Sequence, residues 1–309
     1  MSRDRAILIF GPTASGKSAL ALRLASAFNG VVINADSMQL YRDLAVLTAR
    51  PGAAEEAKAP HLLFGHVDGA VPYSTGLWLA DALAALKRAE HTGRLAIFVG
   101  GTGLYFKALT QGLSAIPAVP SDIRQKIRGL AADLKAEELH VALALRDPAM
   151  AARLRPSDPQ RILRALEVFE ATGQSLLSFQ DKRETALLAP QDYAAIFLAT
   201  DRCALKAQIA IRFESMLKAG ALQEVERLRD RRLDQRLPVM RALGVPPLIA
   251  HLEGKLTLAE AAAQAIRETA QYAKRQVTFA RHQLSSFAFM TAPEAEAFFF
   301  KALSGNEPM

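Results

Sequence analysis

The sequence predicts an α/β fold, in which a parallel sheet lies between layers of helices and an all-helical domain is inserted into the chain. Short apolar runs at residues 7–10, 30–35 and 95–99 alternate with helical patterns, which is typical of buried parallel strands. Residues 121–190 carry only helical periodicity, and strand character returns at 192–200. We therefore expect a first part of the core at 1–116, a helical insertion at 117–190 and a second part of the core at 191–309.

Composition limits the classes of protein that the chain can be. Half of the 309 residues are hydrophobic and 22% are charged, as in ordinary globular proteins. The net charge of +7 favours a polyanionic partner. The single cysteine, Cys203, excludes an internal disulfide and a cysteine-based zinc cluster. Because no apolar run approaches about twenty residues, we expect no membrane span and a cytoplasmic protein.

The first strand runs into the pattern G-x-x-x-x-G-K-S at residues 11–18, and a helical pattern follows at 19–28. Strand, glycine-rich loop and helix in this order predict a P-loop, hence a P-loop NTPase-like three-layer core. Backbone N–H groups and the helix dipole favour bound phosphates; Lys17 adds charge and the Ser18 hydroxyl suits Mg²⁺. The predicted phosphate-binding residues are Gly11, Pro12, Thr13, Ala14, Ser15, Gly16, Lys17 and Ser18.

Polar residues follow two more of the predicted strands. Residues 36–39 read D-S-M-Q and residues 100–105 read G-G-T-G-L-Y. Ligands bind at the carboxyl ends of parallel strands, so Asp36 is the first candidate for chemistry. Asp is also a favoured N-cap residue, and Asp36 could instead cap a helix beginning near Met38.

Helices dominate the remaining patterns. Residues 76–90 predict an amphipathic helix with one face formed by Leu77, Ala80, Leu83, Ala84 and Leu86. Residues 203–219 and 265–283 predict two more helices, and 287–290 a last strand. Arg212 interrupts the apolar face of the first of these two, so it either extends to solvent or points at an active site.

The residues alone leave three classes of function open. A transferase and a P-loop kinase acting on a small metabolite use Lys17, Asp36 and Arg212 equally well. A nucleotide switch or RNA-binding module without catalysis would use Asp201, after the strand at 192–200, as a Mg²⁺ ligand.

Five blocks of sequence resemble the tRNA dimethylallyltransferases, also called isopentenyl-tRNA transferases. They are residues 11–18, 34–41 (N-A-D-S-M-Q-L-Y), 100–105, 156–168 (P-S-D-P-Q-R-I-L-R-A-L-E-V) and 272–276 (Y-A-K-R-Q), in family order over nearly the whole chain. The resemblance implies a P-loop core whose helical insertion clamps the tRNA anticodon stem–loop. It also implies transfer of a dimethylallyl group from dimethylallyl diphosphate to the exocyclic N6 amine of the adenosine 3′-adjacent to the anticodon, with release of diphosphate.

The same resemblance implies roles for individual residues. The P-loop would hold the diphosphate of the co-substrate, with Mg²⁺ on Ser18; Asp36 would be the general base, Thr102 would orient the amine, and Arg212 would bind the diphosphate. We expect a monomer. Positions matching tRNA contacts are Asp36, Ser37, Met38, Gln39, Thr102, Arg124, Gln160, Arg161, Ile162, Leu163, Arg164, Arg241 and Gly244. The chain departs from the family pattern at 245–247 (V-P-P) and 270–271 (A-Q), which touches RNA binding more than chemistry.

Overall fold

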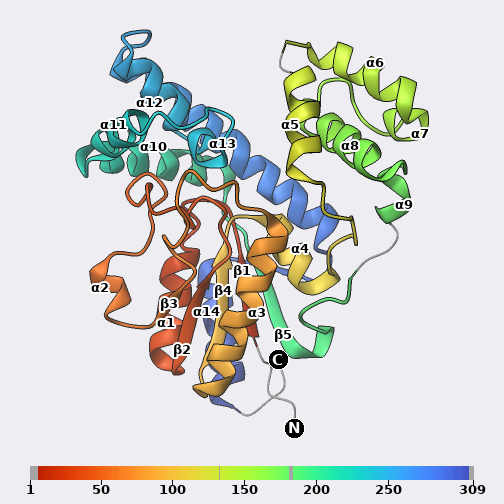
Figure 1. Cartoon of the computed structure of the whole chain (residues 1–309). Coiled ribbons are helices and arrows are strands. Elements are labelled where there is room, and N and C mark those ends of the chain that lie inside the picture. The colour runs from red at the N-terminus through yellow and green to blue at the C-terminus, as the bar shows by residue number, and fades with distance from the viewer. Residues whose placement is uncertain (1–5, 132, 181–183, 306–309) are drawn as a thin grey trace. The chain divides into compact units, whose positions relative to one another are not determined.

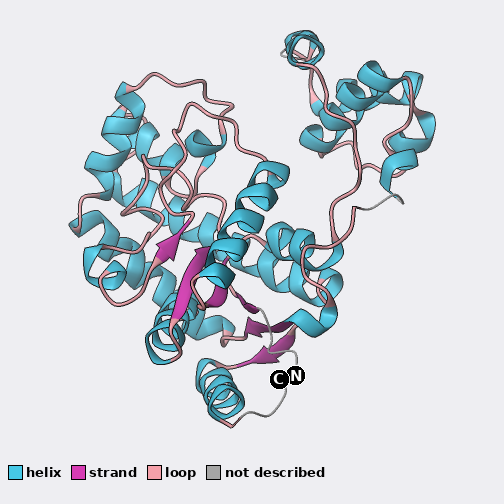
Figure 2. Cartoon of the chain, turned by 60° about the horizontal axis from the view of Figure 1, so that its bottom comes forward, coloured by secondary structure: helices cyan, strands magenta, loops and turns pink. Residues whose placement is uncertain are grey.

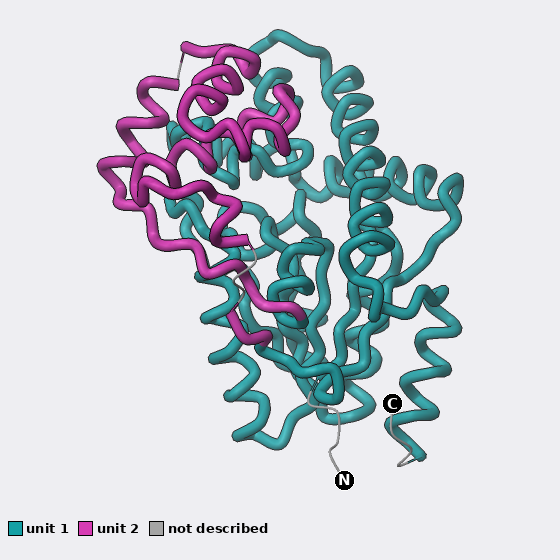
Figure 3. Tube along the Cα trace, turned by 90° about the vertical axis from the view of Figure 1, so that its right-hand side faces the viewer, with its two compact units in different colours: residues 1–110, 187–309 teal, residues 111–186 magenta. Residues whose placement is uncertain are grey.

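The structure is a computed structural model that describes residues 6–131, 133–180 and 184–305 (Figure 1). It divides into two compact units (Figure 3). Residues 1–110 and 187–309 form the first, and residues 111–186 form the second. The second unit thus begins and ends a few residues before the predicted insertion at 117–190.

A six-stranded sheet forms the centre of the first unit, with strand order β3-β2-β4-β1-β5-β6. Every neighbouring pair is parallel, which confirms the predicted parallel α/β fold. All residues of β1 and β2 are buried, as their apolar runs require. The strands are β1 Ala6–Phe10, β2 Gly30–Asn34, β3 His61–Leu62, β4 Leu95–Gly100, β5 Tyr193–Leu198 and β6 Ala288–Met290.

Helices cover both faces of this sheet (Figure 2). Alternate residues of β1 belong to separate cores: Leu8 and Phe10 pack with Trp78, whereas Ile7 and Ile9 pack with Phe299. The unit therefore has three layers. Its helices are α1 Lys17–Ala27, α2 Ala53–Glu56, α3 Thr75–His91, α4 Gly103–Gln111, α10 Arg202–Lys218, α11 Ala221–Asp230, α12 Val245–Leu252, α13 Leu258–Gln283 and α14 Ala292–Ser304, with short 3₁₀ turns at Pro190–Asp192 and Pro238–Arg241.

The buried face of α3 differs from the predicted one. Of the predicted face only Leu86 is buried; Leu77 and Leu83 are 50% and 37% exposed, and the helix buries Trp78, Ala82, Ala85 and Ala89 together with Leu86. The indole of Trp78 stacks on Tyr105 at 4.0 Å between ring centroids, and its Nε1 donates to the Asn34 carbonyl at 3.0 Å. The largest apolar side chain of the helix thus decides which face turns inward.

The second unit consists of helices in its described part, as predicted. They are α5 Ser121–Leu130, α6 Ala136–Arg146, α7 Pro148–Ala151, α8 Pro159–Thr172 and α9 Leu177–Gln180. The unit has its own core, in which Leu143 on α6 packs with Ile162 and Val168 on α8. In neither unit does a described helix have the length and apolarity needed to cross a membrane.

Candidate active site

The loop between β1 and α1 has the geometry of an anion-binding loop. Ala14 and Gly16 both have positive φ, 63° and 85°, which curls the backbone ahead of the first turn of α1. A Cβ on Gly11 would lie 2.9 Å from Ser15 Oγ and 3.1 Å from Leu198 Cβ, so glycine is required there. Ser15 Oγ is buried and has no hydrogen-bond partner among the described atoms. The Ser15 hydroxyl in this loop could therefore donate a hydrogen bond to a bound phosphate group.

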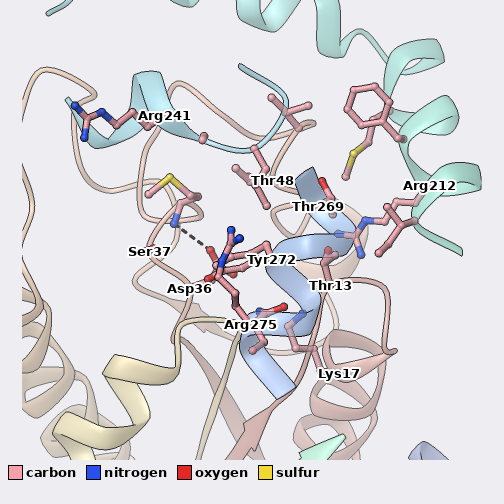
Figure 4. Close-up of a pocket in the computed structure, with 18 residues that line it drawn as sticks. Thr13, Lys17, Asp36, Ser37, Thr48, Arg212, Arg241, Thr269, Tyr272 and Arg275 are labelled. Atoms are coloured by element: carbon pink, nitrogen blue, oxygen red, sulfur yellow. Dashed lines mark hydrogen bonds between the residues drawn. The ribbon is translucent and has the colours of Figure 1, made fainter. Parts of the chain in front are cut away.

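A cavity of about 340 Å³ adjoins this loop (Figure 4). Thr13 and Lys17 of the loop line it together with Asp36, which follows β2, and Arg212 of α10. The sequence-predicted residues Ser37, Met38 and Arg241 line it as well. The remaining lining residues are Leu47, Thr48, Ile209, Phe213, Met216, Ala242, Leu243, Thr269, Tyr272, Arg275 and Gln276. The structure thus brings one carboxylate and several cationic groups around a single cavity.

Asp36 is held by a turn and not by a helix. The residues after it form hydrogen-bonded turns, so the alternative that Asp36 caps a helix near Met38 is wrong. Its Oδ1 accepts from the Met38 N–H at 3.0 Å. Asn34 Nδ2 donates to the Asp36 carbonyl at 3.0 Å, while Asn34 Oδ1 accepts from the Asp36 N–H at 2.8 Å. Both main-chain groups of Asp36 are fixed, and one carboxylate oxygen is committed to the turn.

Burial lowers the pKa of both cations, Lys17 and Arg212. Burial, with the Arg212 charge as a smaller cause, lowers the pKa of Lys17 from 10.5 to about 8, although the Asp36 carboxylate opposes the shift. Burial likewise lowers the pKa of Arg212, again against the effect of Asp36. Lys17 Nζ donates to the Pro12 carbonyl at 3.1 Å. A divalent anion between these cations would relieve their repulsion.

Thr102 lies beside the cavity and does not line it. Its Oγ1 accepts from the Ser37 N–H at 2.9 Å and donates to Ser37 Oγ at 3.2 Å. The neighbouring Gly101 carbonyl accepts from Gln276 Nε2 at 2.7 Å and from Tyr272 Oη at 3.2 Å. The strand ends after β2 and β4 are therefore tied to each other and to α13.

Several other predicted residues lie outside the cavity lining. Ser18 is exposed in the first turn of α1. Gln39 donates both amide hydrogens to carbonyls, of Thr48 at 2.9 Å and of Ala49 at 3.1 Å. Gly244, with φ 89°, is the N-cap residue immediately before α12. Asp201, the Mg²⁺ ligand of the non-catalytic alternative, is exposed and caps α10 by accepting from two N–H groups.

The predicted residues of the second unit lie on α5 and α8. Arg161 is exposed, with 75% of its side chain accessible, and its Nε lies 3.4 Å from Asp158 Oδ2. Ile162 is fully buried in the core of the unit, and Leu163 packs against that core. Glu167 lies 2.8 Å from Arg128 and 3.8 Å from Arg164, and the pKa of Arg164 is lowered chiefly by burial. Arg124 and Gln160 lie on α5 and α8, respectively.

More than half of the residues that line the cavity are not among the predicted site residues. Tyr272, Arg275 and Gln276 come from a block that was singled out only by its resemblance, and no role was assigned to them. Nothing in the local sequence marks Thr48 or Thr269, because packing of distant segments alone brings them to the cavity. On α10, the local signal for a cavity residue is an arginine, Arg212, inside the apolar face of a helical pattern.

The sheet order, the P-loop and the cavity beside it define the chain as a P-loop α/β protein with a helical insertion. Comparison with known proteins is more specific. The family model described as IPP transferase matches residues 39–283, and that described as isopentenyl transferase matches residues 4–62. The chain therefore belongs to the IPP transferase family.

Relatives and solved structures agree with this assignment. The tRNA dimethylallyltransferase of Beijerinckia indica is 62% identical over 298 residues, which cover 96% of this chain and 99% of that protein. The tRNA isopentenylpyrophosphate transferase of Bacillus halodurans superposes with a TM-score of 0.69 at 29% identity, covering 98% of this chain and 97% of the other. A eukaryotic dimethylallyltransferase acting on tRNA gives a TM-score of 0.82 at 26% identity, covering 98% of this chain and 80% of the other.

Proposed function

We propose that this chain transfers the dimethylallyl group of dimethylallyl diphosphate to the N6 amine of the adenosine 3′-adjacent to the anticodon of tRNA. The observation that carries the proposal is one cavity that holds a carboxylate, Asp36, together with Lys17 and Arg212. A carboxylate can accept the proton that the amine loses, and the cations can bind the diphosphate that leaves.

Lys17, Arg212 and the P-loop form the diphosphate end. The loop N–H groups, the unpartnered Ser15 hydroxyl and the first turn of α1 favour an anion there. No cluster of three or more acidic, histidine or cysteine residues suited to a metal occurs in the described part of the chain. A Mg²⁺ ion would therefore rely on phosphate oxygens with the exposed Ser18 hydroxyl as a protein ligand, a donor set that fits Mg²⁺. Bound there, it would supply further neutralisation of the diphosphate charge.

Asp36 forms the amine end. In the transfer, the bond between the allylic carbon and the diphosphate oxygen breaks, the bond from N6 to that carbon forms, and one N6 proton passes to the carboxylate. Oδ1 already accepts the Met38 N–H, so we assign proton acceptance to Oδ2. Thr102 acts through Ser37, whose main chain and hydroxyl it binds. The amine lone pair is delocalised into the purine ring, so a fixed carboxylate contributes directly to the rate.

The proposed contacts to the anticodon stem–loop are Arg161, Arg164 and Gln160 of α8 and Arg124 of α5 in the helical unit. Ile162 is fully buried in the core of this unit, so it supports α8 and offers no side chain to RNA, and Leu163 packs against the same core. The exposed guanidinium group of Arg161 and the half-buried ones of Arg164 and Arg124 suit phosphates and unstacked bases. An adenosine stacked in a loop cannot reach an enclosed cavity, so we expect it to flip out before it reacts. Gln39 would contact RNA only through atoms other than its amide hydrogens, because both are donated internally.

Nucleoside mass analysis tests this proposal. Unmodified tRNA with adenosine after the anticodon is incubated with the protein, Mg²⁺ and dimethylallyl diphosphate, and its nucleosides are weighed. The proposal predicts an adenosine heavier by one dimethylallyl group. A parallel reaction with ATP and small hydroxyl acceptors tests the kinase alternative, which the family assignment disfavours. ATP turnover without prenylated adenosine would overturn the transferase.

A further inference from the structure

The loop at residues 44–49, between the Asp36 turn and α2, is bound at its beginning by a buried carboxylate. Glu224 on α11 is 4% exposed. Its Oε1 accepts from the N–H groups of Ala45 at 2.6 Å and Val46 at 3.0 Å, and its Oε2 accepts from the Leu47 N–H at 2.9 Å. Three charge-assisted hydrogen bonds to consecutive main-chain groups fix both the position and the orientation of this loop.

The same loop is bound at its end. The Thr48 hydroxyl donates to the Leu44 carbonyl at 2.8 Å, and Gln39 binds the Thr48 and Ala49 carbonyls. Leu47 and Thr48, between these anchors, line the cavity. The loop therefore presents Leu47 to the cavity from a fixed backbone.

Leu47 is part of a tightly packed apolar wall. A Cβ on Gly244 would lie 3.1 Å from Leu47 Cδ1 and 3.2 Å from Phe213 Cε2, so both side chains close on the glycine. The apolar residues that line the cavity from this loop, α10 and the segment before α12 are Leu47, Ile209, Phe213, Met216, Ala242 and Leu243. Their side chains supply apolar surface that an allyl chain could contact in this cavity.

We propose that Glu224 is a positioning residue that fixes the Leu47 wall, and that this wall limits the transferred chain to five carbons. This inference rests on the proposed function. A longer chain that extends toward this wall would meet Leu47 and Phe213, which already close on Gly244. Leu47 cannot move with its backbone while Glu224 holds three of the N–H groups in the loop. Glu224, which does not line the cavity, thus contributes to selectivity for the length of the transferred allyl chain.

Four variants test this proposal. Leu47→Ala removes the Leu47 side chain from the wall. Glu224→Ala removes all three hydrogen bonds from Glu224 to the loop. Glu224→Gln keeps an oxygen for the N–H groups of Ala45 and Val46 but turns an amide donor toward the Leu47 N–H. Glu226→Gln is the matched control, because Glu226 lies on the same helix, is 49% exposed and pairs only with Arg229 among described residues, at 3.6 Å. The measurement is kcat/KM for dimethylallyl and for geranyl diphosphate, with tRNA saturating.

The expected result is a fall in the preference for the shorter chain by about tenfold or more in Leu47→Ala and Glu224→Ala, a smaller fall in Glu224→Gln and none in Glu226→Gln. A merely structural Glu224 would lower both rates equally and leave the preference unchanged, which would overturn the proposal. If Glu224→Ala does not fold, Glu224→Gln and Leu47→Ala decide the outcome. If the unsubstituted protein prenylates no tRNA, the proposed function fails, and calorimetric affinities for the two diphosphates then test the wall by the same ratios.

Discussion

The Asn34 side chain binds both main-chain polar groups of Asp36. Its amide nitrogen donates to the Asp36 carbonyl at 3.0 Å, and its oxygen accepts from the Asp36 N–H at 2.8 Å. Asn34 is fully buried, and its amide nitrogen also donates to the Leu63 carbonyl at 3.0 Å. The residue that carries the proposed general base is therefore positioned by the last residue of β2.

Asn34→Ala should uncouple Asp36 from this support. The lost bonds leave buried N–H and carbonyl groups unsatisfied, which costs about 1–3 kcal/mol of unfolding free energy. We expect kcat to fall on the order of 10–100-fold, because a displaced base loses alignment with the amine. Single-turnover rates and urea unfolding measure the two effects. Unchanged kcat in a folded variant would show that Asp36 needs no support from Asn34.

Lys17 should give diphosphate binding a pH dependence. Its pKa is lowered to about 8, so the ammonium is fully present below that pH and is lost as pH rises through it. Bound diphosphate favours the charged form, so binding near and above pH 8 should take up a proton and weaken as pH rises. Calorimetry in buffers of different ionisation enthalpy measures the uptake. Lys17→Arg, which stays charged, should abolish it; persistence of the uptake in that variant would assign it to another group.

Arg161→Ala should weaken tRNA binding and reduce the slope of log K against log salt by about one. The side chain is 75% exposed, so the change should not perturb the core of the helical unit. Arg88→Ala, at an exposed position near the end of α3, is the matched control and should leave the slope unchanged. Equal slopes for Arg161→Ala and the unsubstituted protein would make Arg161 an ordinary solvated side chain.

Gly101→Ala should damage the site sterically. The added Cβ would lie 2.5 Å from Gln276 Nε2 and 3.0 Å from Asp36 Oδ2, so both polar groups must shift. We expect turnover to fall by about 10²-fold or more while tRNA affinity is kept. Gly129→Ala in α5 is the control, because a Cβ there meets nothing within 4 Å and should stabilise by up to about 1 kcal/mol. Full activity of Gly101→Ala would contradict the close approach of these groups.

The sequence predicts the sheet well because buried parallel strands are short, apolar at every position and separated by helical patterns, as in β1, β2 and β4. Local patterns are weaker for helices that pack on two sides. They assign Leu77 and Leu83 to the apolar face of α3, although Trp78 determines which face is buried, and they miss α12 and α14.

Some residues of the candidate site can likewise be predicted from local patterns, and others cannot. The P-loop and Asp36 follow strands directly, so the chain itself shows that they meet at one edge of the sheet. Leu47, Thr48 and Thr269 reach the cavity, and Glu224 reaches the main chain of Leu47, through contacts between segments far apart in sequence. Such contacts depend on how loops and helices pack, which no local pattern records.

The central claim is that Asp36 is the base of a prenyl transfer to tRNA. The most direct measurement is the single-turnover rate of adenosine prenylation, with tRNA affinity determined in parallel, for the unsubstituted protein, Asp36→Asn and Asp201→Asn. Asp36→Asn keeps the size of the side chain but cannot accept the proton, whereas Asp201 is an exposed helix cap that does not line the cavity. We expect a loss of about 10²–10⁴-fold in rate for Asp36→Asn with tRNA affinity retained, and normal rates for Asp201→Asn. An Asp36→Asn variant that prenylates tRNA at the normal rate would show that Asp36 is not the base.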